Sequence, residues 1–237
     1  MKKILFLFAA VALSLTAATD GIAHNIGGKK QSTFSIGNGK ERIEASGNIV
    51  SETRKAAAFH AIEAGPAVKV VVGDYPEGEV TVEADDNILS YVKIDVEEGR
   101  LKIGYATEKV TLCDPHATIY VSASGVTQLK AQNASKIITE VSLTGNNILL
   151  EADSASKIEA SVNGNSCEIK CNSVAKITAA VVVASLTAEA DSVAKITVKG
   201  KAGKCRLKAV SVAKIDASGL EAGEWETEAS SLAKISR

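Results

Sequence analysis

Polar and apolar positions alternate through the C-terminal half of the chain in segments that share one seven-residue phrase, small-x-Ser-small-small-Lys-Ile. The phrase occurs six times, and the steps between its lysines are 21, 19, 19, 19 and 20 residues. Its copies span residues 131–137, 152–158, 171–177, 190–196, 209–215 and 229–235. A period this short is typical of a solenoid, because each repeat can bury its apolar side only against neighbouring copies.

When the repeats are aligned on the phrase, apolar residues form columns that we expect to face inward. One column lies four residues before each copy, a second lies two residues before it, and the Ile of the phrase forms a third. The first two columns contain Ile148, Cys167, Leu186, Cys205 and Trp225, and Leu150, Ile169, Ala188, Leu207 and Thr227. The bulky Trp225 lies in the last full repeat, where we expect it to close the end of a narrow core.

The residue just before each copy carries a charge whose sign alternates along the chain. These residues are Lys130, Glu151, Lys170, Glu189, Lys208 and Glu228. In a parallel stack, opposite charges would meet across neighbouring strands, and such pairs contribute ~0.2–1 kcal/mol each. A slip by one repeat would bring like charges together, so the pattern predicts coils stacked in a fixed register.

The segment before the repeats is predicted to be β as well. Between residues 49 and 121, period-two alternation at 68–72, 80–84, 92–96, 101–103 and 118–121 is separated by turn signals. We therefore predict an all-β parallel β-helix or β-solenoid with 19–21 residues per coil. One domain would span 49–237, with an irregular N-terminal part at 49–121, which suits the capping end of a stack, and regular repeats at 122–237. Residues 24–48, polar and rich in Gly, are predicted to form a flexible leader.

The N-terminus has the features of a secretory signal peptide. Lys2 and Lys3 precede an apolar run at 4–15, and small residues follow up to Ala23. We expect residues 1–23 to be removed and the protein to be exported to the periplasm, the cell surface or the extracellular space. The apolar run is shorter than the ~20 residues that a membrane-spanning helix needs, so no transmembrane segment is expected.

Composition limits the classes of partner. The 237 residues are 46% hydrophobic but only 4% aromatic, which suits stacked strands of small and β-branched side chains. A formal net charge of −1 gives no overall attraction to nucleic acid, so no nucleic-acid partner is expected. A glycan or a cell-surface protein is the expected partner, and association through the solenoid ends stays open.

Four cysteines in an exported chain raise the question of disulfides. Cys167 and Cys205 occupy the same register position two coils apart, which is about 9–10 Å at the usual strand spacing and too far for a bridge. We expect buried free thiols that act as small apolar groups. A bridge that involves Cys113 is the alternative.

The lysines of the phrase would stack at roughly 4.8 Å intervals, and two interpretations of this row are open. In the first, the lysine stems splay into solvent, cover apolar surface and discourage edge aggregation. In the second, they form a basic stripe that binds a regularly charged anion such as an acidic polysaccharide. The stripe would contain Lys136, Lys157, Lys176, Lys195, Lys214 and Lys234. Nearby acids at Asp153, Glu159, Asp191 and Asp216 weaken the second interpretation.

The third position of each copy is a Ser or an Asn. We expect this residue at a bend, with its side chain hydrogen-bonded to backbone or to the next coil.

Catalytic and metal-binding patterns are sparse. The adjacent acids Asp85-Asp86 and Glu97-Glu98 lie at predicted turns, where we expect solvated side chains rather than a glycosidase pair. Cys113, Asp114 and His116 lack a second ligand group, so a turn is favoured over a zinc site. No cofactor is expected. The leading hypothesis is a non-enzymatic binding or scaffold protein; a carbohydrate-active β-helix enzyme acting on an acidic polysaccharide is the alternative.

The chain resembles the GIN domain family of auto-transporter adhesin head domains. The N-terminal resemblance rests on residues 47–54, 59–62, 68–70, 86–89 and 98–101, and the C-terminal one on the Asp-Ser-Ala-Ser and Asp-Ser-Val-Ala turns. Together they cover residues 47–237. The resemblance implies a secreted, right-handed β-solenoid of bacterial origin with a surface or adhesive role, and it supplies no catalytic residues. Because no translocator sequence follows residue 237, self-transport is not expected.

Overall fold

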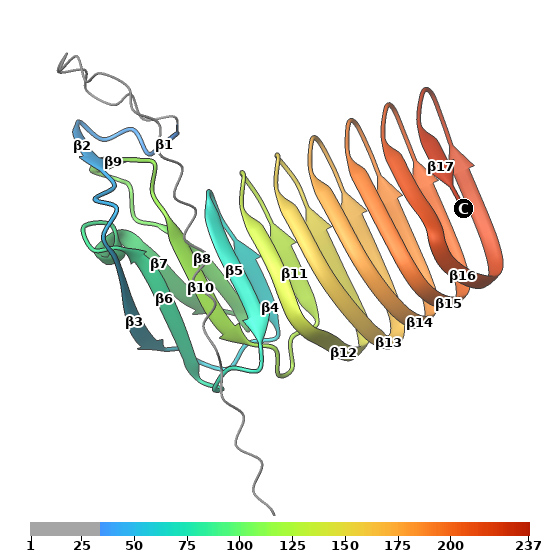
Figure 1. Ribbon diagram of the computed structural model, residues 1–237, viewed down its shortest axis with the longest axis horizontal. Coiled ribbons are helices and arrows are strands. Elements are labelled where there is room, and N and C mark those ends of the chain that lie inside the picture. Colours follow the sequence, from blue (N-terminus) through green and yellow to red (C-terminus); the bar gives the residue numbers. More distant parts are fainter. Residues whose placement is uncertain (1–33) are drawn as a thin grey trace, which may run out of the picture. The chain divides into compact units, whose positions relative to one another are not determined.

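The computed structural model describes residues 34–237, and over this range the chain is built from strands and one short 3-10 helix (Figure 1). The elements are β1 (Ser35–Ile36), β2 (Glu41–Glu44), β3 (Ile49–Lys55), β4 (Ala61–Ala64), β5 (Val68–Gly73), β6 (Glu79–Asp85), η1 (Leu89–Tyr91), β7 (Val92–Glu97), β8 (Arg100–Tyr105), β9 (Val110–Cys113), β10 (Ala117–Ser122), β11 (Gln128–Ala131), β12 (Lys136–Ala152), β13 (Lys157–Cys171), β14 (Lys176–Ala190), β15 (Lys195–Ala209), β16 (Lys214–Ala229) and β17 (Lys234–Ser236). The predicted signal peptide at 1–23 lies outside the described residues.

The regular repeats form a parallel solenoid, as predicted. The long strands β12 to β16 stack in sequence order, each paired in parallel with the next. Each long strand runs along one wall, bends and returns along the other, and the phrase turn then leads into the next strand (Figure 1). The period-two alternation dictates this arrangement, because one set of side chains meets inside the coil while the other faces outward.

The solenoid contains one further coil that the repeat pattern did not reveal. β4 pairs in parallel with β11, and β5 pairs in parallel with the first residues of β12. This register sets Ala64 opposite Ala131 and Lys69 opposite Lys136. Residues 64–70 are therefore a diverged copy of the phrase, and residues 74–127 are an insertion between this coil and the next.

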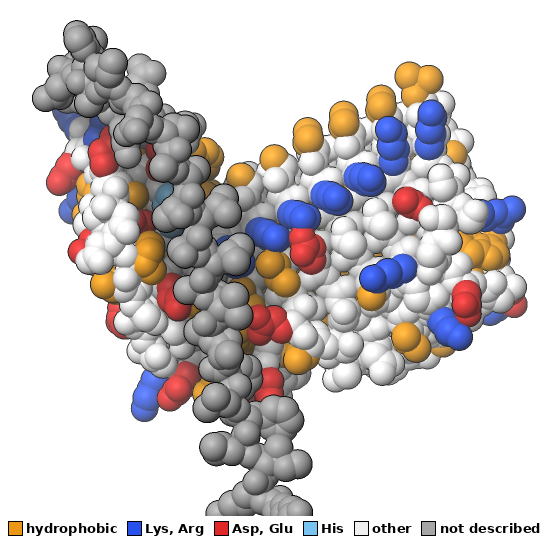
Figure 2. Space-filling view, viewed as in Figure 1, with side chains coloured by type: hydrophobic (Ala, Val, Ile, Leu, Met, Phe, Trp, Pro, Cys, Tyr) orange, Lys and Arg blue, Asp and Glu red, His pale blue; other side chains and the backbone are white. Residues whose placement is uncertain are grey.

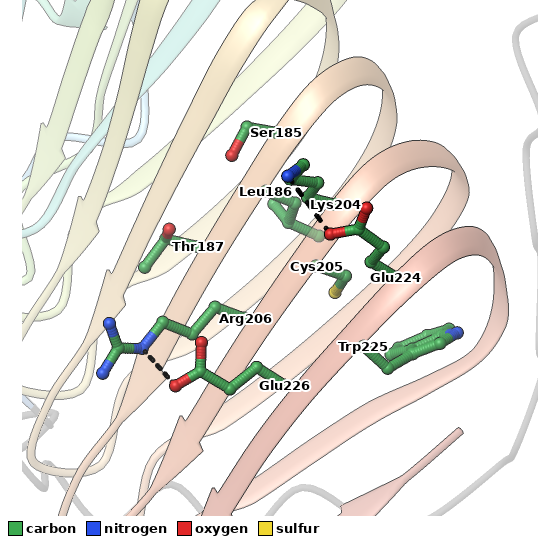
Figure 3. Close-up of a pocket in the computed structure, with 9 residues that line it drawn as sticks. All are labelled: Ser185, Leu186, Thr187, Lys204, Cys205, Arg206, Glu224, Trp225 and Glu226. Carbon is green, nitrogen blue, oxygen red and sulfur yellow. Dashed lines mark ion pairs between the residues drawn. The ribbon is translucent and has the colours of Figure 1, made fainter.

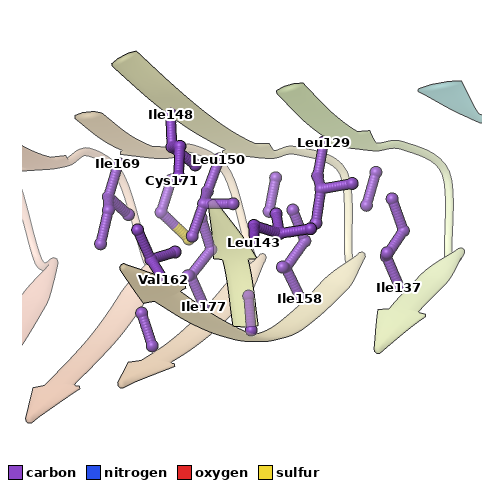
Figure 4. Packing of buried hydrophobic residues seen from close by; sticks show 14 of the residues in the cluster. Leu129, Ile137, Leu143, Ile148, Leu150, Ile158, Val162, Ile169, Cys171 and Ile177 are labelled. Atoms are coloured by element: carbon purple, nitrogen blue, oxygen red, sulfur yellow. The ribbon is translucent and has the colours of Figure 1, made fainter. Parts of the chain in front are cut away.

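The core lies between the two walls of each coil (Figure 4). Ile137, Ile158 and Ile177 of the phrase are fully buried, and the other two predicted columns also face inward over most of their length. The last coil differs. Trp225 is partly buried and packs against the core, whereas Thr227 is exposed. Thr227 keeps the register of its inward column, opposite Leu207, but it is not buried, because β17 pairs with β16 only at residues 214–216 and leaves Thr227 uncovered among the described residues.

The N-terminal strands are β, as predicted, but they form more than a simple cap. β10 pairs in parallel with β5 and antiparallel with β6, and β6 also pairs with β3. A separate three-stranded sheet has the order β1-β9-β2. β1 and β2 come from the predicted flexible leader at 24–48. That prediction was wrong for residues 35–36 and 41–44, because their backbone groups pair with β9.

All four cysteines are free and buried, in agreement with the favoured expectation. Cys113 ends β9 and has no disulfide partner. Burial raises the pKa of the Cys167 thiol to about 12 and that of Cys171 to about 11. Because the reactive form of cysteine is the thiolate, these two side chains serve packing rather than chemistry.

Candidate binding surface

The lysines of the phrase form one continuous row on the outer face of a solenoid wall (Figure 2). Each begins a strand, and each is aligned with the lysine of the next coil. The buried Ile that follows fixes this orientation, because neighbouring side chains on a strand point to opposite faces. The structure brings all six sequence-predicted lysines together and adds Lys69 from the diverged coil. We call this row the lysine ladder: Lys69, Lys136, Lys157, Lys176, Lys195, Lys214 and Lys234.

The two halves of the lysine ladder differ in their electrostatic environment. Glu159 pairs with Lys157 and also lies 3.4 Å from the Nζ of Lys136. The hydrogen bond from Lys157, together with the charge of Lys136, lowers the pKa of Glu159. In the next two coils the position of Glu159 is occupied by Thr178 and Thr197.

The C-terminal half of the lysine ladder is consequently free of ion pairs. Within residues 34–237, no carboxylate pairs with Lys176, Lys195, Lys214 or Lys234, and all four side chains are exposed. An acid reappears at this position in the coil of Lys214, where Asp216 accepts hydrogen bonds from the backbone and hydroxyl of Ser218. Its pKa is lowered mainly by the Ser218 hydroxyl and only in small part by Lys195.

The aspartates in the turns are engaged by serines. The hydroxyl of Ser173 donates to Asp153 over 2.7 Å, and that of Ser211 donates to Asp191 over 3.0 Å. These bonds join one coil to the next, as expected for the third position of the phrase. The bond from Ser173 is the main cause of the lowered pKa of Asp153. Of the acids that weakened the basic-stripe interpretation, the three aspartates are thus hydrogen-bonded to serine hydroxyls. Glu159 pairs only with the lysines at 136 and 157 within the described residues.

A row of exposed apolar side chains runs beside the lysine ladder, and sequence reasoning missed it. We call it the apolar ridge: Val174, Val193, Val212 and Leu232, which are 66%, 60%, 48% and 75% exposed. Each lies at the fourth position of the phrase, two residues before a lysine of the ladder. In Figure 2 this apolar row follows the edge of the wall next to the lysines.

The apolar ridge begins where the turn changes its backbone conformation. In the two earlier coils the same position holds Ala134 and Ala155, both in the left-handed region with φ of 63°. In the later coils the preceding serine alone takes positive φ, as Ser173 does at 59°. This change admits a β-branched side chain, because valine is poorly tolerated in the left-handed region. A signal was present in the sequence, since three valines and a leucine replace two alanines.

The second wall of the solenoid carries the alternating charges. The predicted column, Lys130 to Glu228, is aligned residue by residue across the strands, and the register extends it to Glu63, Lys102 and Asp95. Lys130 lies 3.9 Å from Glu63, and Lys208 lies 3.6 Å from Glu228. Lys170 instead pairs with Glu168 of its own strand. The column is consistent with the predicted register device.

A hollow of about 380 Å³ lies on the wall formed by β14, β15 and β16 (Figure 3). Its charged side chains pair with one another. Lys204 lies 3.2 Å from Glu224, and Arg206 lies 3.5 Å from Glu226. Trp225 and Cys205 also line the hollow. These cross-strand pairs leave no uncompensated charge directed at a ligand, so the lysine ladder is the stronger candidate surface.

The candidate catalytic acids have structural partners. Asp85 is fully buried, so the expectation of a solvated turn acid was wrong for it. Its carboxylate accepts a 2.7 Å hydrogen bond from the backbone N of Gly47 and lies 3.6 Å from Nδ1 of His116. Asp86 is exposed, and Glu97 pairs with Lys102 at 2.5 Å, as suits turn residues.

Across residues 34–237, no cluster of three His, Cys, Asp or Glu side chains is arranged for metal binding, and no helix is long and apolar enough to cross a membrane.

Comparison with known proteins places these observations in a family. The family model described as "Putative auto-transporter adhesin, head GIN domain" matches residues 58–236, in agreement with the resemblance noted from the sequence. No curated protein matches the chain.

Solved structures share the fold at low sequence identity. A putative adhesin from Parabacteroides merdae superposes with a TM-score of 0.73 at 15% identity, covering 82% of this chain and 83% of its own. A putative adhesin from Parabacteroides distasonis gives 0.73 at 18% identity, with 82% and 84% covered. A structure from the same species named a putative lipid binding protein gives 0.72 at 20% identity, with the same coverage. At these identities the likeness shows the fold alone.

Proposed function

Because the chain belongs to the family "Putative auto-transporter adhesin, head GIN domain", we propose that it is an exported, non-enzymatic adhesin-like protein whose lysine ladder binds an acidic polysaccharide. The proposal of export rests on the signal-peptide features of residues 1–23 and on the adhesin family. A cell-surface glycan is a partner that such a location would offer.

The observation that carries the proposal is the unpaired half of the lysine ladder. Lys176, Lys195, Lys214 and Lys234 lie in register on neighbouring strands without ion-pair partners among the described residues. At the spacing of ~4.8 Å, two like charges repel by about 1 kcal/mol in water before salt screening. A linear polyanion that follows the solenoid axis would relieve this repulsion along its whole length, which a single small anion would not.

An aromatic pair beside the N-terminal end of the lysine ladder favours a sugar polymer. Tyr75 and Tyr120 pack edge to face with ring centroids 5.6 Å apart. Their hydroxyls donate to Glu140 and Glu83, each over 2.9 Å. Tyr120 lies on β10, two residues from the position that pairs with Lys69 of the ladder. Half-buried rings held in this way offer an apolar edge against which a sugar ring would pack.

A carbohydrate-active enzyme remains the alternative, and a direct assay separates it from a binding protein. Among the acids that the sequence offered for catalysis, Asp85 is buried and bonded to Gly47, and Glu97 is paired with Lys102. An enzyme would release new reducing ends from the polysaccharide it binds, whereas the proposed binding protein would leave the polymer length unchanged.

The proposal is tested with a glycan array at two salt concentrations. The wild type is compared with the variant Lys176→Gln, Lys195→Gln, Lys214→Gln, and with Lys40→Gln, Lys55→Gln, Lys109→Gln, which removes the same charge away from the ladder. We expect salt-sensitive binding to acidic glycans that falls by about tenfold in the ladder variant, since each exposed pair contributes up to ~1 kcal/mol. The absence of acidic-glycan binding, or equal loss in both variants, would rule out the lysine ladder as a polysaccharide site.

A further inference from the structure

The apolar ridge and the unpaired lysines of the ladder occur in the same coils. Val174 precedes Lys176 by two residues, and the same relation holds in each later coil up to Leu232 and Lys234. In the two coils just before them both features are absent together: the ridge position holds Ala134 and Ala155, and Lys136 and Lys157 are paired with Glu159. One surface therefore combines exposed hydrocarbon with lysines that have no ion-pair partner among residues 34–237, along four successive turns.

An acidic polysaccharide does not account for the hydrocarbon. Its charged and hydroxyl groups would pair with the lysines, but a hydrated polymer would remove little water from protruding aliphatic side chains such as Leu232, which is 75% exposed. Aliphatic side chains on protruding turns gain free energy only when water is removed from them. A partner that covers the apolar ridge as well as the lysines must therefore present anionic groups and accessible hydrocarbon side by side.

We propose that the apolar ridge, together with Lys176, Lys195, Lys214 and Lys234, docks the solenoid onto an anionic lipid bilayer. The proposal rests on the C-terminal half of the lysine ladder being a binding surface, as proposed above, and assigns it a lipid partner. The ridge enters the boundary between headgroups and acyl chains, and the lysines, two residues further on, reach the anionic headgroups with their flexible stems.

The geometry of the turns suits such contact. The ridge residues lie at the turns between strands, and the backbone N of Val193 and Val212 donates to the serine carbonyl of the previous coil at 2.9 Å. The turns are thus rigidly stacked, and the four ridge residues form a straight line about 14 Å long at a strand spacing of ~4.8 Å. A rigid line presents its side chains together, without the ordering cost that a flexible segment would bring.

Of the carboxylates in these coils, Asp191 in a turn and Asp216 on the strand of Lys214 bear on the strength of the contact. Asp191 accepts hydrogen bonds from the backbone N of Ser192 and the hydroxyl of Ser211, and Asp216 accepts from Ser218. They reduce the surface charge of the four lysines by half. We therefore expect reversible, salt-sensitive binding that requires anionic lipid, rather than stable insertion.

The test is co-sedimentation with vesicles of phosphatidylcholine alone and of phosphatidylcholine mixed with phosphatidylglycerol. The ridge variant is Val193→Ser, Val212→Ser, Leu232→Ser, and its matched control is Ala134→Ser, Ala155→Ser at the same turn position. We expect the wild type to bind only the mixed vesicles. The ridge variant and the Lys176→Gln, Lys195→Gln, Lys214→Gln variant should each lose at least about tenfold in partitioning, and the control should bind as the wild type does.

Insertion is measured separately with Val193→Trp and brominated lipids. Quenching of the new indole, beyond that of Trp225 in the wild type, is expected on mixed vesicles. Failure of the wild type to bind the mixed vesicles, or full binding by the ridge variant, would overturn the lipid proposal.

The same proteins on the glycan array distinguish the two proposals. Lysine-dependent glycan binding without vesicle binding leaves the polysaccharide proposal standing and removes the lipid one. Ridge-dependent vesicle binding without glycan binding supports the lipid proposal and removes the polysaccharide one. If neither glycan binding nor vesicle binding depends on the lysines, the lysine ladder is not a binding surface.

Discussion

At the scale of single residues, serine hydroxyls in the turns hold one coil to the next. Ser173 donates to the carboxylate of Asp153 over 2.7 Å, and the same contact recurs between Ser211 and Asp191. A hydroxyl that donates to a carboxylate favours its ionised form. The lowered pKa of Asp153 follows chiefly from this bond and is therefore a measure of how firmly two turns are joined.

Substitution of Ser173→Ala is expected to raise the pKa of Asp153 toward its ordinary value. Because the folded-state pKa is below the unfolded one, the contribution to stability is present above the unfolded pKa of about 3.9 and is lost as pH falls through the folded pKa. The variant should therefore show a smaller difference in unfolding free energy between neutral and strongly acidic pH. NMR titration of the Asp153 carboxyl carbon gives the pKa directly. Ser192→Ala is the control, because Ser192 is at the aligned position but its hydroxyl makes no hydrogen bond within residues 34–237. An unchanged Asp153 titration in the Ser173 variant would contradict the assignment.

Single residues also show where sequence reasoning ends. The serine of the phrase could be placed at a bend because its role depends on neighbours a fixed number of residues away. The burial of Asp85 could not be predicted, because its partners are distant in the sequence. Gly47 lies in the connection between β2 and β3, and His116 lies in the connection between β9 and β10. Local sequence around Asp85-Asp86 is indistinguishable from that of a solvated turn.

At the scale of elements, the charge column is expected to favour the observed matching of strands. It runs from Asp95 on β7 to Glu228 on β16, with each charge aligned with one of opposite sign. The individual pairs are exposed and worth little, but they add along the stack. We expect their larger effect to be a penalty on pairings that skip one coil, because these bring like charges together.

Charge reversal within the column tests this role. Glu189→Lys would place three lysines in a row, at 170, 189 and 208, and is expected to lower the free energy of unfolding by about 1 kcal/mol, since two favourable pairs become unfavourable. Glu189→Gln removes the charge without reversing it and should cost about half as much. Chemical denaturation at low and high salt measures both. A loss that persists undiminished at high salt would show that the effect is not electrostatic.

The six regular coils were predictable at the element scale, whereas the seventh was not. Residues 64–70 keep the small residue at one end and the lysine and aliphatic residue at the other, but Gly65 and Pro66 replace the polar residues of the turn. The next coil begins only after the insertion at 74–127. A period cannot be detected when one interval is so much longer than the rest, so Lys69 of the lysine ladder was found only from strand pairing.

At the scale of the described region, Asp85 ties the three-stranded sheet to the larger one. It ends β6 and accepts a hydrogen bond from Gly47, in the connection between β2 and β3. It also lies 3.4 Å from the backbone N of His116, just before β10. This buried carboxylate therefore holds the connections that lead out of the three-stranded sheet, from β2 to β3 and from β9 to β10, against the end of β6.

Asp85→Ala is expected to lower the free energy of unfolding by about 1–3 kcal/mol, because it removes a buried carboxylate that accepts hydrogen bonds from the backbone N of Gly47 and of His116. Asp86→Ala removes an exposed carboxylate from the same turn and should cost less. Hydrogen exchange should show faster opening of β2 and β9 in the Asp85 variant while β13 to β15 stay protected. Uniform loss of protection across both regions would mean that Asp85 stabilises the region as a whole rather than this junction.

The alternating charge column also constrains the number of coils that the solenoid can gain or lose. Removal of residues 157–175 would set Glu151 beside Glu189, whereas removal of 157–194 would set Glu151 beside Lys208. Only an even number of deleted or duplicated coils preserves the alternation. This protein can therefore be lengthened, by gene duplication or by design, in units of two coils. The structural repeat is a single coil, but the charge repeat is a pair.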